Sequence, residues 1–220
     1  MQTNKVKKGI ILQLNRIIRR FILADLILFS GWGLISPLMS IFIVQKINGD
    51  LINVGISVAI YWLVRSIVEL PLSNKLDEIR GQKDDFYALV IGLFIVAISA
   101  FALAAVKSVN QLYLVRSIEA FGFAMYYSSW SGIFSRNLDK DRIAFSWSAD
   151  HIAVGIASAI GGILGGLIAT LFGFEYIFIF GGILSLAAAF VLISVPKIIF
   201  PKPITGKKGP ILDHSAKSIT

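Results

Sequence analysis

The sequence predicts an all-α, polytopic membrane protein with six transmembrane helices. Hydrophobic residues make up 56% of the 220 residues and charged residues only 15%, whereas soluble domains carry about 45–50% apolar and about 25% charged residues. The apolar residues also fall into six runs, each close to the length of about 20 residues that a helix needs to cross the hydrocarbon core. The basic residues concentrate in alternate connections between these runs, as in proteins that cross a membrane repeatedly.

Each predicted span is an apolar run that ends where turn-forming or charged residues begin. The runs, in order, are Phe21–Val44, Leu51–Leu72, Phe86–Val106, Val109–Phe134, Ile143–Phe172 and Tyr176–Val195. The breaks between them, in the same order, are Asn48-Gly49-Asp50, Ser73–Asp85, Lys107-Ser108, Arg136–Arg142 and Gly173-Phe174-Glu175. Connections this short force consecutive helices to alternate in direction. We therefore divide the chain into a basic arm (1–20), a six-helix bundle (21–196) and a basic tail (197–220).

The positions of the basic residues predict the orientation of the bundle. Of the 21 Lys and Arg residues, all but Lys46, Lys107, Arg65 and Arg116 lie in the arm, the tail, or the connections after spans two and four. Cytoplasmic segments are the ones enriched in Lys and Arg, so both termini are expected in the cytoplasm, with the bundle in the plasma (inner) membrane. The net charge of +8 is thus interpreted as an orientation signal and a contact with anionic lipids, not as a nucleic-acid interface.

The residue types exclude several kinds of chemistry. The sequence contains no cysteine and only two histidines, so disulfides and thiol chemistry are impossible, and no ligand spacing typical of a metal site is present. We expect no cofactor and no metal ion.

Charged side chains inside the predicted spans are the candidate functional residues. They are Asp25, Arg65, Glu69, Arg116, Glu119, Asp150 and His151. Such groups are costly in hydrocarbon and usually face a bundle interior or an aqueous cavity. The spacings of Arg65 to Glu69 and of Arg116 to Glu119 allow ion pairs within one helix. Such pairs could neutralise each other and have no role beyond the structure.

The pair Asp150 and His151 is different, because adjacent helical residues point about 100° apart and cannot neutralise each other within the helix. Histidine titrates near neutral pH, so a proton-linked role is natural there. We take Asp25, Arg116, Glu119, Asp150 and His151 as candidates for a solute or proton path, with Arg65 and Glu69 as a supporting charge pair.

Small residues predict where helices pack closely, since transmembrane helices associate through small side chains. The fifth span has Gly155, Gly162 and Gly166 on one face, with Gly161 and Gly165 beside it. We expect tight helix packing along that face.

Four stretches resemble one half of a major facilitator superfamily transporter. GLISPLMSIFIV is similar to the family's first helix, and LSNKLDEIRGQK resembles its motif A, although Ser73 replaces the first glycine and Gly81 comes one residue late. RSIEAFGFA resembles motif B, with Arg116 at its arginine and Ala120 at a usual glycine. GIASAIGGILGG followed by FGFEYIFIFGG resembles the glycine-rich fifth helix and the entry to the sixth.

The resemblance implies a secondary transporter that works by alternating access on a small polar or amphiphilic solute. The motif B arginine of the family is associated with proton coupling, which implies that role for Arg116. Motif A forms a gate in the family, which implies Asp77 as its latch, with Arg80, Gly81 and Lys83 in the same gate and Arg65 and Glu69 behind it, reaching toward Asp150.

Family members usually have twelve spans in two similar halves, and this sequence holds one set of six. The expected assembly is a half-size transporter that pairs with an identical copy, as a homodimer, or with a separate six-helix chain.

Two other functions remain open from the residues. A six-helix scaffold without transport, or a remnant half of a split transporter, fits the same composition. An intramembrane serine protease would use Ser129 or Ser131 with His151, although the Gly-x-Ser pattern is missing. We expect no enzymatic activity.

Overall fold

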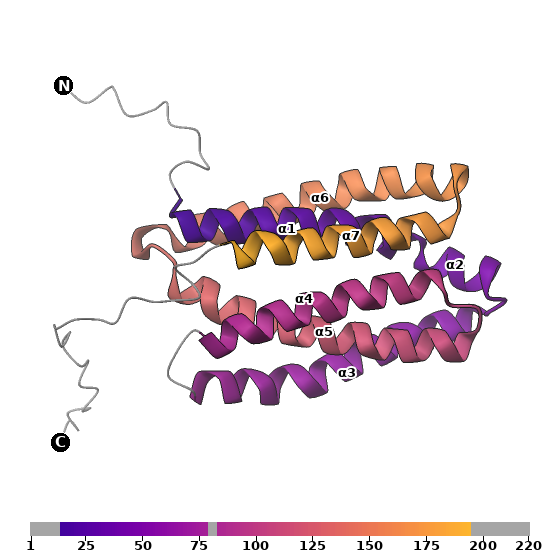
Figure 1. The fold of residues 1–220 in the computed structure, drawn as a ribbon, viewed down its shortest axis with the longest axis horizontal. Coiled ribbons are helices and arrows are strands. Elements are labelled where there is room, and N and C mark those ends of the chain that lie inside the picture. The colour runs from indigo at the N-terminus through magenta and orange to yellow at the C-terminus, as the bar shows by residue number, and fades with distance from the viewer. Residues whose placement is uncertain (1–13, 79–82, 195–220) are drawn as a thin grey trace, which may run out of the picture.

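The computed structural model describes residues 14–78 and 83–194, and this part of the chain is a bundle of long helices (Figure 1). The elements are α1 (Arg16–Ile35), η2 (Ser36–Leu38), α2 (Met39–Lys46), α3 (Leu51–Glu78), α4 (Lys83–Ala104), α5 (Val109–Arg136), η3 (Lys140–Arg142), α6 (Ile143–Leu171) and α7 (Phe174–Ile193). No strand occurs among these residues. The all-helical prediction is therefore confirmed.

Five helical stretches are long and apolar enough to cross a membrane. They are the continuous run α1–η2–α2, and α3, α4, α6 and α7. The 28-residue α5 is not among them, because Arg116, Glu119 and several other polar residues lower its hydropathy. The chain is thus a polytopic membrane protein on composition and helix length, and α5 is its most polar long helix.

The helices form a series in which each packs mainly on its neighbours. α1 packs against α6 and α7, α4 packs against α7 and α5, and α5 packs against α3. Figure 1 shows α6, α1 and α7 along one half of the bundle and α4, α5 and α3 along the other. Because α3 and α6 stand at the two ends of this series, they are the least buried: only 6% and 17% of their most apolar windows are buried, against 44–50% in the other candidate spans.

The helix boundaries follow local chemistry. The Asn15 side chain caps α1 by accepting a hydrogen bond from Ile17 N at 2.7 Å, a typical N-cap contact. Asp50 accepts from Asn53 N at 2.8 Å, and Asn53 Oδ1 accepts from Asp50 N at 3.0 Å, so the start of α3 is held by a reciprocal cap. Pro37 lies in η2 between α1 and α2, where its missing N–H interrupts the α-helical ladder.

Several helix boundaries differ from the expected ones. α1 begins at Arg16, within the expected arm, and α3 continues through Pro71 to Glu78, where we expected a charged connection. Charged residues end a hydrophobic run without ending a helix, so hydropathy marks the edge of the span and not the end of α3. The α6–α7 turn includes the expected Gly173, which has φ 104°, in the left-handed region that glycine adopts readily, but α7 begins at Phe174, two residues before the expected span.

The close contact between α1 and α6 uses glycines other than the expected ones. A Cβ atom added to Gly161 would lie 2.7 Å from Ser30 O, so the α1 and α6 backbones nearly touch there. By contrast, a Cβ on Gly155 or Gly166 would meet nothing within 4 Å, and one on Gly162 would meet only Pro37 at 3.8 Å. Close packing of Gly155, Gly162 and Gly166 therefore does not occur among the described residues.

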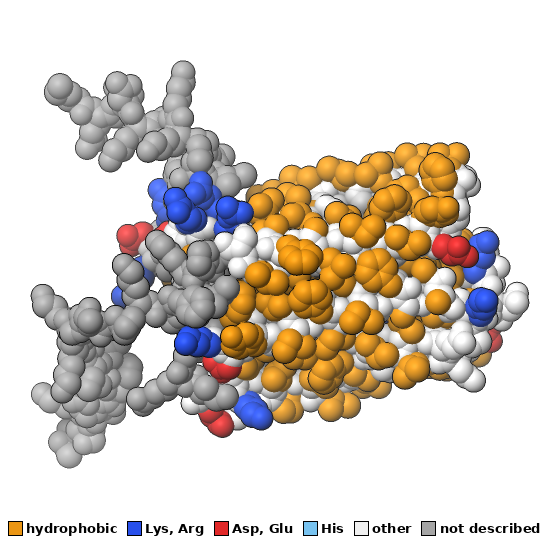
Figure 2. Space-filling model, in the orientation of Figure 1, with side chains coloured by type: hydrophobic (Ala, Val, Ile, Leu, Met, Phe, Trp, Pro, Cys, Tyr) orange, Lys and Arg blue, Asp and Glu red, His pale blue; other side chains and the backbone are white. Residues whose placement is uncertain are grey.

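The outer surface suits a lipid environment. Figure 2 shows a broad band of hydrophobic side chains across the face in view, with Lys, Arg, Asp and Glu gathered toward the two ends of the bundle. Large apolar side chains on α3 and α6 are widely exposed, among them Leu63 and Ile67 on α3 and Ile163 and Leu171 on α6. Exposed apolar patches of this extent mark contact with lipid or protein.

Candidate functional site

Four helices, α1, α3, α5 and α6, share one face of the bundle, and two pockets open on that face. We call them the Arg116 pocket and the Asp150 pocket. The pockets have Phe29 and Tyr127 in common as lining residues, so they are neighbours along the same face. Of the charged residues that the sequence analysis placed inside the spans, all but Arg65 line one of the two pockets.

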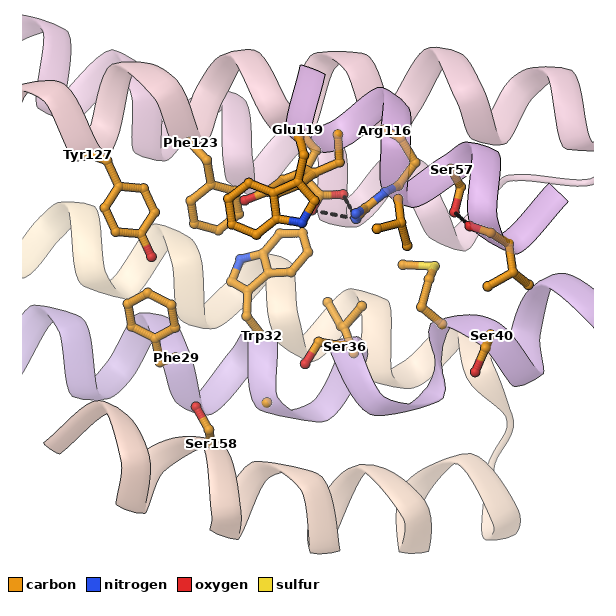
Figure 3. A pocket seen from close by; sticks show the side chains of 17 residues that line it. Phe29, Trp32, Ser36, Ser40, Ser57, Arg116, Glu119, Phe123, Tyr127 and Ser158 are labelled. Atoms are coloured by element: carbon orange, nitrogen blue, oxygen red, sulfur yellow. Dashed lines mark hydrogen bonds and ion pairs between the residues drawn. The ribbon is translucent and has the colours of Figure 1, made fainter. Parts of the chain in front are cut away.

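The Arg116 pocket has a volume of about 340 Å³. Figure 3 shows Arg116, Glu119, Phe123 and Tyr127 on one side of it and Phe29, Trp32, Ser36 and Ser40 on the opposite side. Its remaining lining residues include Tyr61 and Trp62 of α3 and Ser158 of α6. The pocket thus combines aromatic rings and hydroxyl groups around one charged pair.

Arg116 and Glu119 form the ion pair that their spacing predicted. Arg116 Nη1 donates to both carboxylate oxygens of Glu119 at 2.6 Å, and Glu119 is only 2% exposed. The Arg116 guanidinium also lies 4.6 Å from the ring centre of Tyr61 on α3. Arg116 Nε has no hydrogen-bond partner among the described residues. The pair is charge-balanced, and one of its donors is unpaired within the described residues.

Two aromatic residues that line this pocket contact each other across it. The Trp32 ring lies 5.1 Å from the Phe123 ring in an edge-to-face arrangement, a favoured geometry for aromatic pairs. Trp32 Nε1 has no partner among the described residues and is a second unpaired donor at the Arg116 pocket. A solute held here would have hydrogen-bond acceptors for these two donors and an apolar part for the rings.

The Asp150 pocket has a volume of about 320 Å³ and is lined by Asp25, Phe29, Glu69, Tyr127, Trp130, Ser131, Trp147, Asp150, His151 and Val154. Asp25 of α1 is 2% exposed and accepts a hydrogen bond from the Tyr126 hydroxyl of α5. Asp150 of α6 is 4% exposed, and its Oδ1 has no hydrogen-bond partner among the described residues. His151 is exposed and its ring centre lies 6.1 Å from that of Trp147.

Arg65 and Glu69 pair within α3, with Nε and Oε2 at 2.8 Å. The Arg65 guanidinium lies 3.9 Å from the ring centre of Tyr127 on α5, so this pair also links two helices. The contact that we expected between this pair and Asp150 is not present: Glu69 lines the same pocket as Asp150, while Arg65 is occupied by Glu69 and the two aromatic neighbours Trp62 and Tyr127.

The predicted gate lies at the end of the bundle where α3 ends and α4 begins. Asp77 Oδ1 lies 3.8 Å from Arg136 Nη1 on α5, and Arg136 also pairs with the buried Asp85 of α4. Lys83 is the first residue of α4, whereas Arg80 and Gly81 lie outside the described residues. Arg136 therefore joins α3, α4 and α5 at this end.

Sequence reasoning missed three residues that shape the pockets and the gate: Tyr126, Tyr127 and Arg136. Tyr126 follows Glu119 by seven residues, which is two helical turns and places both on one face of α5. Tyr127 lies beside it on α5. That spacing was available as a signal. Arg136 offered none, because its partners come from other helices.

Comparisons with known proteins agree with this architecture. Residues 21–216 match the Major Facilitator Superfamily. The chain is 25% identical over 174 residues to an uncharacterized MFS-type transporter from Methanocaldococcus jannaschii, an alignment that covers 78% of this chain and 44% of the relative. The aligned part of the chain thus spans less than half the length of that relative. Members of this family are transporters and not enzymes, which removes the serine protease alternative. The chain belongs to the Major Facilitator Superfamily.

Proposed function

We propose that the protein is one six-helix half of a secondary transporter, which moves a small polar or amphiphilic solute by alternating access. The observation that carries this proposal is the joint opening of two pockets on one face of the bundle, with buried Asp25, Glu119 and Asp150 inside them. A lipid-facing surface would not keep such groups, because charges in hydrocarbon are costly. A polar path protected from lipid accounts for them.

In this proposal α5 is the sixth span. Its 28 residues give a length of about 42 Å, enough to cross the bilayer. It packs along α3 and α4, and its two intramembrane charges neutralise each other. An even number of spans puts both termini on the same side of the membrane, and the distribution of the basic residues puts that side in the cytoplasm. The bundle then lies in the plasma membrane.

A second six-helix unit completes the polar path. The pockets lie between α3 and α6, the two least buried of the candidate spans, so a second unit seated on these helices would enclose the pockets. The outward-facing glycines Gly155, Gly162 and Gly166 allow a partner helix to approach α6 closely. The partner is a second copy of the chain or a separate six-helix segment, consistent with the 44% coverage of the relative.

Asp77 acts as the latch of the gate in this assembly. Its side chain is 76% exposed and only loosely held by Arg136 at 3.8 Å, so it is accessible to the second unit. The positive end of a partner helix dipole would attract it. Lys83, together with Arg80 and Gly81, belongs to the same gate.

Proton coupling is assigned to Asp25, Asp150 and His151. These groups line one pocket and come from α1 and α6, two helices that pack directly against each other, so Asp25 and Asp150 interact across this contact. Movement of these two helices during alternating access would change the separation of Asp25 and Asp150, and with it the number of protons that they hold. Arg116 and Glu119 contact the solute in the neighbouring pocket.

The test is a flux assay in proteoliposomes, with a panel of polar and amphiphilic solutes and an imposed pH gradient. We expect gradient-driven movement of at least one solute, lost in Arg116→Ala and reduced to passive exchange in Asp25→Asn. Glu175→Gln, a matched carboxylate change in the first turn of α7, should leave flux unchanged. Crosslinking in the membrane should capture a dimer or a complex with a second six-helix chain.

A non-transporting scaffold has one observation in its favour: Arg65–Glu69 and Arg116–Glu119 are neutralised within their own helices. The scaffold predicts no flux for any solute and no effect of Asp25→Asn on a pH gradient. Flux that survives unchanged in both variants would remove the roles given to Arg116 and Asp25.

A further inference from the structure

We propose that the Asp150 pocket binds the charged group of an amphiphilic organic cation. This inference rests on the proposed transport function and names the chemical class of its solute.

The first argument is the charge of the pocket. Three carboxylates line it, from Asp25, Glu69 and Asp150, and no Lys or Arg of the described chain is among its lining residues. Glu69 is balanced by Arg65 at 2.8 Å. The two remaining carboxylates, Asp25 and Asp150, interact with each other, and His151 is the one possible cation among the lining residues of this pocket. The pocket therefore has an excess of negative charge that a positive ligand would balance.

The second argument is the unpaired oxygen of Asp150. Asp25 accepts from the Tyr126 hydroxyl, but Asp150 Oδ1 has no donor among the described residues, although Asp150 is only 4% exposed. A buried acceptor without a partner is unfavourable, and a charged one more so. An ammonium or alkylated nitrogen placed beside Oδ1 satisfies this group in a way that a neutral solute does not.

The third argument is the aromatic lining, formed by Phe29, Tyr127, Trp130 and Trp147. The rings are organised among themselves: Trp130 and Trp147 have ring centres 5.5 Å apart in an edge-to-face arrangement. Ring faces attract cations, and cages of such rings recognise quaternary ammonium groups. The same rings accommodate the apolar body of an amphiphile. A volume of about 320 Å³ lies within the range of small-molecule pockets.

The composition favours an organic cation over a metal ion. No group of three or more His, Asp or Glu side chains in the described residues is arranged to hold a metal, and most lining residues are aromatic or apolar. The Arg116 pocket does not share the preference for cations, because its pair is balanced. Since both pockets are lined by Phe29 and Tyr127, the uncharged part of an elongated cation extends into the Arg116 pocket.

The experiment measures equilibrium binding of radiolabelled tetraphenylphosphonium to the purified full chain in detergent, with tetraphenylborate as a probe of the same shape and opposite charge. We expect saturable binding of the phosphonium and none of the borate. Asp150→Asn should weaken phosphonium binding about tenfold to a hundredfold, and Asp150→Glu should restore most of it. Glu175→Gln, a carboxylate outside the pocket, should bind as the parent chain does. Size-exclusion profiles verify the fold of each variant.

Trp147→Leu and Trp147→Phe provide a second pair in case Asp150→Asn does not fold. Loss of the ring should weaken phosphonium binding roughly threefold to thirtyfold, and the phenylalanine should retain most of it. Equal binding of the borate, or unchanged phosphonium binding in both Asp150→Asn and Trp147→Leu, would overturn the inference.

The two proposals fail in different ways. Phosphonium binding without flux of any solute would support the cation site and remove the transport function. Flux of neutral or anionic solutes by a chain that binds no phosphonium would support transport and overturn the cation site.

Discussion

Arg65 of α3 holds its guanidinium 3.9 Å from the ring centre of Tyr127 on α5. The opposite arrangement occurs farther along the same two helices, where Arg116 of α5 lies 4.6 Å from the ring centre of Tyr61 on α3. Each helix thus supplies one arginine and one tyrosine to the other. These reciprocal contacts join α3, which has few other neighbours in the bundle, to α5 at the pocket walls.

Replacement of Tyr127 tests the contribution of the first contact. Tyr127→Leu removes the ring face beside Arg65, and we expect it to lower the free energy of unfolding by about 1–2 kcal/mol, the range for partly buried cation–π contacts. Tyr127→Phe keeps the ring and should lose much less. Thermal unfolding in detergent, followed by tryptophan fluorescence, measures both. Equal losses in the two variants would mean that the hydroxyl, and not the ring face, supplies the stability.

A double-mutant cycle on Arg116 and Glu119 tests the buried ion pair. Either Arg116→Ala or Glu119→Ala leaves one buried charge without its partner, which costs about 3–5 kcal/mol. The double variant removes both charges and should be more stable than the sum of the two single losses predicts. The coupling free energy comes from the four unfolding measurements. Additive losses would contradict the direct pairing at 2.6 Å.

Arg136 should matter more for stability than Asp77, although both belong to the same cluster. Arg136→Ala leaves the carboxylate of Asp85, 1% exposed, without its ion-pair partner, and we expect a loss of about 1–3 kcal/mol. Asp77→Asn removes a long, exposed pair with Arg136 and should change stability by about 0–1 kcal/mol. Because Asp77 is proposed as the latch, Asp77→Asn should nevertheless alter flux. A large stability loss in Asp77→Asn would assign it to the fold and not to the gate.

Contacts within one helix were predictable from the sequence, and contacts between helices were not. Arg65–Glu69 and Arg116–Glu119 follow from spacings of four and three residues, which bring side chains together on any helix. The Tyr126–Asp25 hydrogen bond and the Arg136–Asp85 pair join residues 101 and 51 positions apart. No periodicity indicates such partners. They depend on which helices are neighbours.

The same distinction explains the glycines of α6. Gly161 and Gly165 lie on one face of α6, and Gly162 and Gly166 lie on the neighbouring face. Spacing alone allowed both faces to pack, and the sequence analysis favoured the face of Gly155, Gly162 and Gly166. In the bundle α1 packs on the face of Gly161 and Gly165. The position of α1 relative to α6 decides which of the two faces is packed, and the sequence of α6 alone does not contain that information.

The two faces of α6 give a final matched pair, Gly161→Ala and Gly166→Ala. A Cβ on Gly161 would lie 2.7 Å from Ser30 O and 3.0 Å from Gly33 C, so helices α1 and α6 must separate and the unfolding temperature should fall. A Cβ on Gly166 meets nothing within 4 Å, so Gly166→Ala should keep the fold and gain up to about 1 kcal/mol from helix propensity. If the outer face receives a second six-helix unit, Gly166→Ala should also reduce the crosslinked complex in membranes. A complex that forms as well in Gly166→Ala as in the parent chain would place the contact elsewhere on the bundle.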